Sequence, residues 1–307
     1  MRLIWVGVLL PVVWSCSGTM PIESGPASRA YQAPDRMISS YYLQQPASRT
    51  LNIKGQLAPL SAGGTPAAIM YPGNNAGGFL AAIAVHAAVN SSVKNAQEQN
   101  RIDRANQILE SYQGLISEVS NEDLHEYVLS GHAGLDMRST PEDTVSLYEN
   151  GWLVTSEPMY TLSSSEDAIY IKNKVIIQDY FMLDNESKDA SVYEKNITIT
   201  SLNSARAYDH SVWLADNGEY FEKSLKHLYA QSIWLAVSDF QGNLPATSSR
   251  TSTIRYLENG EKKVERGKLI NESCDQMLFE TLRGELKVVQ RIEMLDLKTC
   301  TPELFGI

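Results

Sequence analysis

The sequence contains few of the residues and motifs that carry most enzyme chemistry. Its 307 residues include only three cysteines and five histidines, and no two histidines stand four residues apart. It has no CxxC pair, no GxSxG turn and no glycine-rich phosphate loop ending in Lys-Ser or Lys-Thr. The sequence therefore assigns no catalytic residues, and we expect neither a bound metal nor a cofactor.

Clusters of positive charge are also missing from the sequence. The chain has 26 Lys and Arg side chains against 36 Asp and Glu, which gives a formal net charge of −10. No run of Lys or Arg could neutralise successive phosphates, so we expect no nucleic-acid partner. The acidic surplus indicates solubility and leaves the fold open.

The N-terminus does carry a pattern. Arg2 precedes an apolar stretch of twelve residues, Leu3–Trp14. This length fits the core of a signal peptide and is shorter than the ~20 residues that a helix needs to span a bilayer. We therefore expect export from a bacterial cytoplasm, with residues 1–15 forming the signal peptide.

The end of this stretch, Val13-Trp14-Ser15-Cys16, resembles the lipobox of bacterial lipoproteins. The resemblance implies that Cys16 is diacylated, with palmitate among the acyl chains, and becomes the new N-terminus. Trp14 departs from the small or aliphatic residue of the family. Ser17 does not resemble the Asp of inner-membrane retention, so the implied location is the periplasmic side of the outer membrane, with the lipid as membrane anchor. The alternative is an ordinary signal peptide with an incidental cysteine.

Two cysteines remain near the C-terminus, Cys274 and Cys300. Once Cys16 is assigned to the lipid, an even number of cysteines is left in an exported chain, and this predicts one disulfide between them. Closing a loop of this size would stabilise the fold by about 3 kcal/mol in the loop-entropy model. A reactive or metal-binding thiol is the alternative, although no histidine lies nearby in the sequence.

Residues 16–78 differ in composition from the rest of the chain. They hold seven of the twelve prolines and end in a glycine- and asparagine-rich patch at 72–78. Prolines at this density disfavour helices and central strands. We predict a lipidated, largely extended tether with one ordered piece at Leu51–Leu60, and a folded part that does not need residues 17–75.

The rest of the chain predicts an α+β fold. Phe79–Val119 has the longest helical periodicity, within a helical segment expected at 79–130. Residues 150–307 are expected to form an α+β domain, whose one buried helix spans 217–240 and begins with Asp216 as its cap. The predicted fold class is thus a long N-terminal helix, then a mostly antiparallel sheet with one buried helix and a C-terminal β-meander.

The strands of this domain follow from a period of two in the apolar residues. Before the helix, strands are expected at Trp152–Thr155, Tyr160–Leu162, Ala168–Ile171, Val175–Met182 and Val192–Thr200, with a tight turn at Lys172–Lys174. After it, the meander is expected at Thr253–Leu257, Lys262–Ile270, Met277–Leu282 and Leu286–Ile292, with hairpin turns at Asn259-Gly260 and Gly284.

Two hypotheses of function follow from these observations. The first is a non-enzymatic envelope lipoprotein, anchored at Cys16, whose α+β module binds an envelope protein or a cell-wall glycan. The alternative is a periplasmic hydrolase whose site is scattered through the fold. The neighbours Asp209-His210-Ser211 do not decide between them, because catalytic triads assemble from distant segments.

Overall fold

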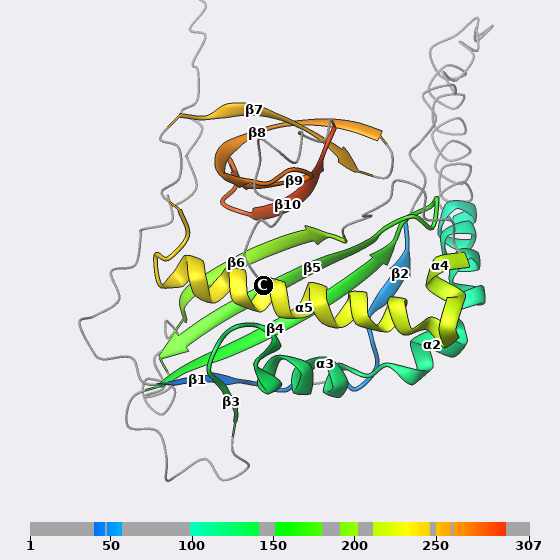
Figure 1. Cartoon of the computed structure of the whole chain (residues 1–307), viewed down its shortest axis with the longest axis horizontal. Coiled ribbons are helices and arrows are strands. Elements are labelled where there is room, and N and C mark those ends of the chain that lie inside the picture. The colour runs from blue at the N-terminus through cyan, green and yellow to red at the C-terminus, as the bar shows by residue number, and fades with distance from the viewer. Residues whose placement is uncertain are drawn as a thin grey trace, which may run out of the picture. The chain divides into compact units, whose positions relative to one another are not determined.

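The computed structural model describes residues 40–46, 48–56, 99–140, 151–179, 191–201, 211–245, 250–258 and 261–292. These residues form a ten-stranded sheet in the order β3-β1-β4-β5-β6-β10-β7-β8-β9, and β2 also pairs with β4 (Figure 1). The strands are β1 (Ser40–Leu43), β2 (Ile53–Gly55), β3 (Met137–Ser139), β4 (Gly151–Leu162), β5 (Ile169–Asp179), β6 (Ser191–Thr200), β7 (Ser252–Glu258), β8 (Glu261–Glu272), β9 (Gln276–Thr281) and β10 (Leu286–Arg291). The helices and helical turns are η1 (Leu109–Tyr112), α2 (Gln113–Glu118), α3 (Asn121–Tyr127), η2 (Val128–His132), α4 (Ser211–Leu214), η4 (Ala215–Gly218) and α5 (Glu219–Phe240).

The predicted fold class is wrong, because sheet dominates the structure and no long N-terminal helix is present in the described part of the chain. Helix is described from residue 99, and the 3-10 turn η1 interrupts it before the short α2. Residues 79–98, the first half of the predicted helix, lie outside the described residues. The sheet is also mixed, since β1 runs parallel to both β3 and β4, and β6 runs parallel to β10.

The predicted C-terminal meander is instead a closed barrel. Consecutive strands β7 to β10 pair antiparallel, as a meander would, but β10 also pairs with β7, Arg291 lying opposite Tyr256. This fourth pairing joins the ends and encloses a small core of Ile254, Tyr256, Met277, Phe279 and Val289. Turn residues specify hairpins but not which distant strands meet, so the sequence could not reveal the closure.

Part of the predicted tether is a component of the sheet. Within 16–78, β1 and β2 both pair with β4, and the side chain of Leu43 is completely buried in the main core. Gly55 approaches the helix at 99–108 so closely that a Cβ there would lie 1.6 Å from the carbonyl oxygen of Ala105. The prediction that residues 17–75 are dispensable for folding is therefore wrong for the part that contains these strands.

The predicted turn at Lys172–Lys174 lies in the middle of β5, which runs unbroken beside β4. Asn173 points into the protein and donates a hydrogen bond from Nδ2 to Ser232 Oγ at 2.8 Å. A buried asparagine flanked by two lysines resembles a turn in sequence, yet the alternation of a strand continues through it.

The helix α5 covers one face of β4, β5 and β6 (Figure 1). Phe240 meets Trp152 edge to face at 4.9 Å, and Tyr229 OH lies 2.8 Å from Ser156 Oγ. The predicted cap at Asp216 is not used: the N-cap is Gly218, with φ of 79°, and no side chain caps the helix. Glycine adopts this left-handed conformation without the penalty of a Cβ.

Candidate functional site

A groove of about 740 Å³ lies along the middle of β4, on the edge that β1 and β2 share. Among the described residues, β1 pairs with β4 only up to Val154, and β2 begins opposite Tyr160. The last bonds on either side run from Gln44 N to Val154 O at 2.9 Å and from Tyr160 N to Asn52 O at 2.7 Å. The stretch of β4 between these bonds borders the groove.

The groove exists because the neighbouring chain is longer than the strand beside it. Leu43 is opposite Val154 and Ile53 is opposite Tyr160, so ten steps of chain accompany six steps of β4. The excess lies in the described residues 44–46 and 48–52, which we call the groove wall. Pro158 explains why the neighbouring chain does not pair with β4 at this point, since proline has no N–H to donate to a neighbouring strand.

The peptide groups of Ser156 face into this gap. Alternate residues of a strand direct their N–H and C=O to the same side, and Val154 and Tyr160 both bond toward β1 and β2. Ser156 and Pro158 lie between them with the same parity. The edge of β4 therefore offers one N–H and two carbonyl oxygens to whatever occupies the groove.

The groove wall is held in place by the start of α3. Asn121 is buried and donates from Nδ2 to Ser48 O at 2.8 Å and to Thr50 O at 3.0 Å. Its backbone N–H donates to Arg49 O at 3.0 Å. Because these bonds within the chain fix the position of the wall, the groove is largely preformed.

The N-terminus of α3 is itself stabilised by a capping box. Ser120 Oγ accepts from the backbone N–H of Asp123, and Asp123 Oδ2 accepts from Ser120 N at 2.7 Å. The hydrogen bond from the Ser120 hydroxyl holds the pKa of Asp123 below its usual value. The cap fixes the position of Asn121, the next residue along the chain.

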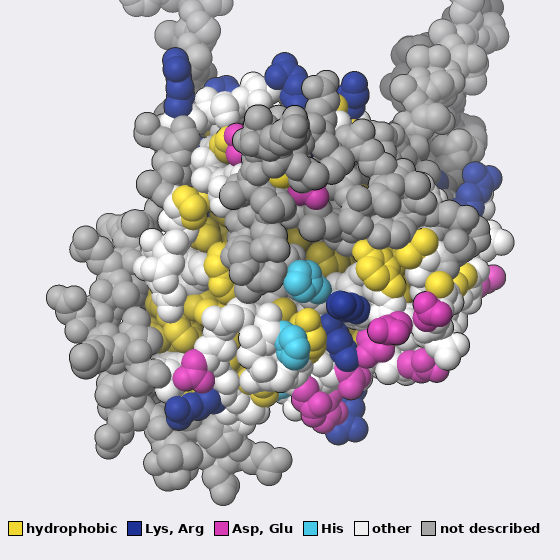
Figure 2. All heavy atoms as spheres, viewed as in Figure 1, with side chains coloured by type: hydrophobic (Ala, Val, Ile, Leu, Met, Phe, Trp, Pro, Cys, Tyr) yellow, Lys and Arg dark blue, Asp and Glu magenta, His cyan; other side chains and the backbone are white. Residues whose placement is uncertain are grey.

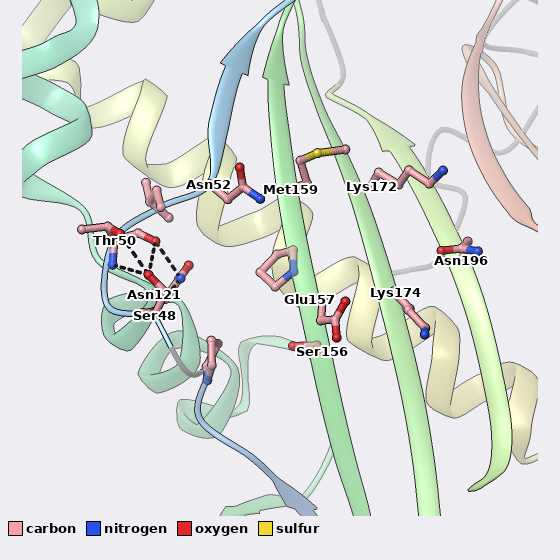
Figure 3. A pocket seen from close by; sticks show the side chains of 13 residues that line it. Ser48, Thr50, Asn52, Asn121, Ser156, Glu157, Met159, Lys172, Lys174 and Asn196 are labelled. Carbon is pink, nitrogen blue, oxygen red and sulfur yellow. Dashed lines mark hydrogen bonds between the residues drawn. The ribbon is translucent and has the colours of Figure 1, made fainter.

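The floor of the groove is the face of β4–β6 opposite α5, and it is charged. Figure 3 shows Ser48, Thr50 and Asn121 on one side and Lys172, Lys174 and Asn196 on the other, with Glu157 and Met159 between them. The strand registers place Glu157 beside Lys174 and Met159 beside Lys172. Both signs of charge therefore stand on neighbouring strands.

The two lysines of the floor differ in availability. Lys174 Nζ lies 2.9 Å from Glu194 Oε1, and this hydrogen bond and attraction, with a smaller attraction from Glu157, raise the lysine pKa. Lys172 is exposed and forms no ion pair among the described residues. Lys172 and Glu157 are thus the charges that remain for a ligand.

Asn121, which holds the groove wall, also has an unused acceptor. Asn121 Oδ1 is buried without a hydrogen-bond partner among the described residues. The amide is not reversed, because its nitrogen already faces two carbonyl oxygens that would repel an oxygen. Because this atom is inaccessible to solvent, a ligand donor would reach it only if the side chains around it moved.

The residues predicted from the sequence lie away from this groove or outside the described chain. Cys16 and Cys300 are outside the described residues. Cys274 is buried between β8 and β9. The Cys274–Cys300 disulfide and the lipid on Cys16 therefore stay predictions.

The histidines that the structure describes do not form a catalytic group. His125 Nε2 lies 3.0 Å from Leu43 O in the core. His132 stacks on Tyr127 with ring centroids 4.1 Å apart. His227, on α5, has its pKa lowered by partial burial and by Lys223. Across the described ranges, no three His, Cys, Asp or Glu side chains gather as metal ligands would.

None of the helices in the described ranges is long and apolar enough to cross a bilayer. Comparisons with known protein families, with curated proteins and with solved structures find no match to this chain. The groove geometry is therefore the basis for any statement about binding.

The sequence did not reveal the groove residues. Lys172 and Lys174 were assigned to a turn, Asn196 was noted only as a chance Asn-x-Thr site, and Glu157 was not singled out. The sequence feature that could have revealed the lysines is the alternation of polar with apolar residues along β5. This alternation places the apolar residues under α5 and the lysines on the opposite face. The meeting of β4 with the groove wall had no such signal.

Proposed function

We propose that this protein is a non-enzymatic envelope lipoprotein, anchored through Cys16 on the periplasmic side of the outer membrane, whose folded part binds an extended segment of an envelope protein in the β4 groove. The observation that carries the binding part is the unpaired middle of β4 between β1 and β2. The anchor rests on the lipobox resemblance at Val13–Cys16.

An extended peptide suits this groove better than a compact ligand. A peptide that adds to a sheet edge gains main-chain hydrogen bonds, and its alternate side chains meet the flanking surface. Here Ser156 supplies the main-chain groups. Glu157 and Lys172 project from β4 and β5 on the open face and would meet basic and acidic side chains of the ligand (Figure 3). A cell-wall glycan lacks the regular N–H donors and carbonyl acceptors that a strand edge pairs with.

The test is a peptide selection followed by a charge exchange. Random peptides of twelve residues would be selected on the full chain, and the affinity of the best binders measured by fluorescence anisotropy. The double variant Glu157→Lys/Lys172→Glu keeps the net charge and reverses the two free charges of the floor. We expect it to weaken binding at least tenfold, or about 1.4 kcal/mol.

Two further measurements make the test decisive. A peptide with its acidic and basic residues exchanged should regain affinity for the double variant. The matched control is Glu219→Lys/Lys223→Glu, an exchange between exposed residues on α5, away from the groove, and it should leave affinity unchanged. Peptides that bind both double variants as well as the natural chain would show that the groove is not the binding site.

The partner in the cell can be identified by crosslinking from within the groove. A photo-crosslinking amino acid in place of Met159, which lies in the middle of the groove, should form an adduct with an envelope protein. The same residue placed at Lys223 should not form that adduct. An adduct at both positions would argue against specific binding in the groove.

A further inference from the structure

The outer face of the β7–β8 hairpin assembles positive charge that is dispersed in the sequence. Arg255 lies opposite Val264, and Thr253 lies opposite Arg266. The alternate residues of β7, Ile254 and Tyr256, point into the barrel core. Alternation along β8 places Lys262 and Lys268 on the same outer side. We call Arg255, Lys262, Arg266 and Lys268 the basic face. In Figure 2, Lys and Arg side chains gather along the top of the view, where Figure 1 places β7 and β8.

The charges of the basic face are not neutralised within the described chain. All four side chains are exposed, and none forms an ion pair or a side-chain hydrogen bond with a described residue. The acid on β8 between them, Glu265, has the opposite parity and lies 2.8 Å from Lys287 Nζ. The outward positions of the two strands, from Thr253 to Leu257 and from Lys262 to Lys268, include no Asp or Glu. A protein of net charge −10 thus carries a locally cationic surface.

Exposed apolar side chains accompany these cations. The described residues include three exposed large hydrophobic side chains, and two of them, Val264 and Leu282, belong to this region, each with 64% of its surface exposed. Val264 stands between Lys262 and Arg266 on β8. Gly267 pairs with Thr281, and Leu282 follows Thr281 in the turn after β9. Aliphatic side chains set among cations are the composition of a surface that enters the headgroup region of a bilayer.

We propose that the basic face binds an anionic phospholipid surface, with the cations against lipid phosphates and Val264 and Leu282 inserted between headgroups. This goes beyond peptide binding in the β4 groove and does not depend on it. Nucleic acid is the less favoured partner, because the outward positions of β7 and β8 carry no aromatic side chain on which a base could stack.

The test measures partitioning of the full chain onto lipid vesicles. All proteins would carry Cys16→Ala, so that acylation plays no part. Vesicles would contain phosphatidylcholine alone, or with about one third phosphatidylglycerol. The apolar stretch at the N-terminus is common to all variants. The measured quantity is therefore the partition coefficient on vesicles with phosphatidylglycerol divided by that on phosphatidylcholine vesicles, determined once at low salt and once at high salt.

The variant Arg255→Glu/Arg266→Glu should reduce this ratio by at least about 25-fold, since each lost cation near an anionic bilayer contributes roughly fivefold and each new glutamate adds repulsion. The control Arg138→Glu/Lys223→Glu changes the net charge by the same amount at exposed residues of β3 and α5 and should leave the ratio near that of the natural chain. Val264→Ser/Leu282→Ser should lower partitioning without changing its salt dependence. Unchanged melting temperatures would show that the variants remain folded.

Three outcomes would contradict binding of the basic face to an anionic lipid surface. Equal loss in the two charge variants would mean that net charge, and not the basic face, decides binding. A serine variant that partitions as well as the natural chain would rule out insertion. Binding to a DNA duplex that depends on Arg255 and Arg266, with no preference for phosphatidylglycerol, would replace the lipid surface with nucleic acid as the partner.

Discussion

Replacing Lys195 should show how much more a buried ion pair contributes to the stability of this protein than an exposed one. Its Nζ lies 2.7 Å from Asp239 Oδ2 on α5 and 3.0 Å from Glu280 Oε1 on β9, and 11% of its side chain is exposed. Tyr193 OH donates to the same Asp239 oxygen at 3.0 Å. One cation on β6 thus ties the helix to the closed barrel.

The pKa of Lys195 is raised above its usual value. Burial alone would lower this pKa, but attraction and hydrogen bonds from Asp239 and Glu280 outweigh the burial. A raised folded-state pKa contributes stability that is fully present below the unfolded value and is lost only as the pH rises through the folded value. The stabilising contribution is therefore complete at neutral pH.

Replacing Lys195 with Met keeps the length and apolar stem of the side chain but leaves two carboxylates facing each other. Their oxygens lie within about 6 Å, which corresponds to about 3 kcal/mol of repulsion at an effective dielectric constant of ~20. Removing one partner of a buried pair typically costs about 3–5 kcal/mol, and these side chains are partly exposed. We expect the free energy of unfolding to fall by about 2–4 kcal/mol in urea titrations of the full chain.

Lys174→Met is the matched control. Lys174 forms an ion pair of similar length with Glu194, 2.9 Å, but the two side chains are 37% and 53% exposed. Exposed pairs contribute at most about 1 kcal/mol, so this variant should be nearly neutral. Adding Glu280→Gln to Lys195→Met should recover part of the loss. Equal costs for the two lysines would refute the reasoning.

Three further predictions concern the N-terminus, the cysteines and β1. Cys16→Ala should abolish labelling with radioactive palmitate and release the chain from the outer membrane; equal labelling would contradict the anchor. Peptide mapping without reductant should find Cys274 linked to Cys300, and reduction should lower the melting temperature by an amount that reflects about 3 kcal/mol; two free thiols would exclude the bond. Leu43→Ala should cost about 2–5 kcal/mol in urea unfolding, because it empties a buried position of the core, whereas the exposed Lys54→Ala should cost under about 0.5 kcal/mol. A neutral Leu43→Ala would mean that β1 is not part of the folded core.

Local patterns predicted the elements that depend on local chemistry. The helix expected at 217–240 corresponds to α5, and Gly242, with φ of 71°, follows its end as a C-terminal glycine does. The strands expected after α5 agree with β7 to β10 within a few residues. These elements have strong periodicity and glycine-containing turns, so neighbouring residues contain most of the information that specifies them.

Features that depend on distant contacts were not predictable. Leu43 is separated by 111 positions from Val154, its partner across the β1–β4 pair, and nothing near residue 43 marks that pairing. The prolines around it favoured a tether, although short parallel strands at a sheet edge tolerate proline nearby. The break expected between Trp152–Thr155 and Tyr160–Leu162 is also absent, because β4 runs through both. Pro158, within the expected break, is a missing donor on the open side of this strand.

The groove and the basic face arise from the same property of the fold. One helix, α5, covers one face of β4–β6, and the barrel buries only the inner face of β7 and β8. In each case part of the other face of the strands is exposed, and the period of two places charge there, mixed at Glu157 and Lys172 and positive at Arg255 and Arg266. Polar residues that looked unremarkable in the sequence therefore become two distinct surfaces, because strand alternation sorts them by face. The prediction of no nucleic-acid partner was drawn from the absence of Lys/Arg runs in the sequence, yet alternation along two strands can assemble a cationic surface without any such run.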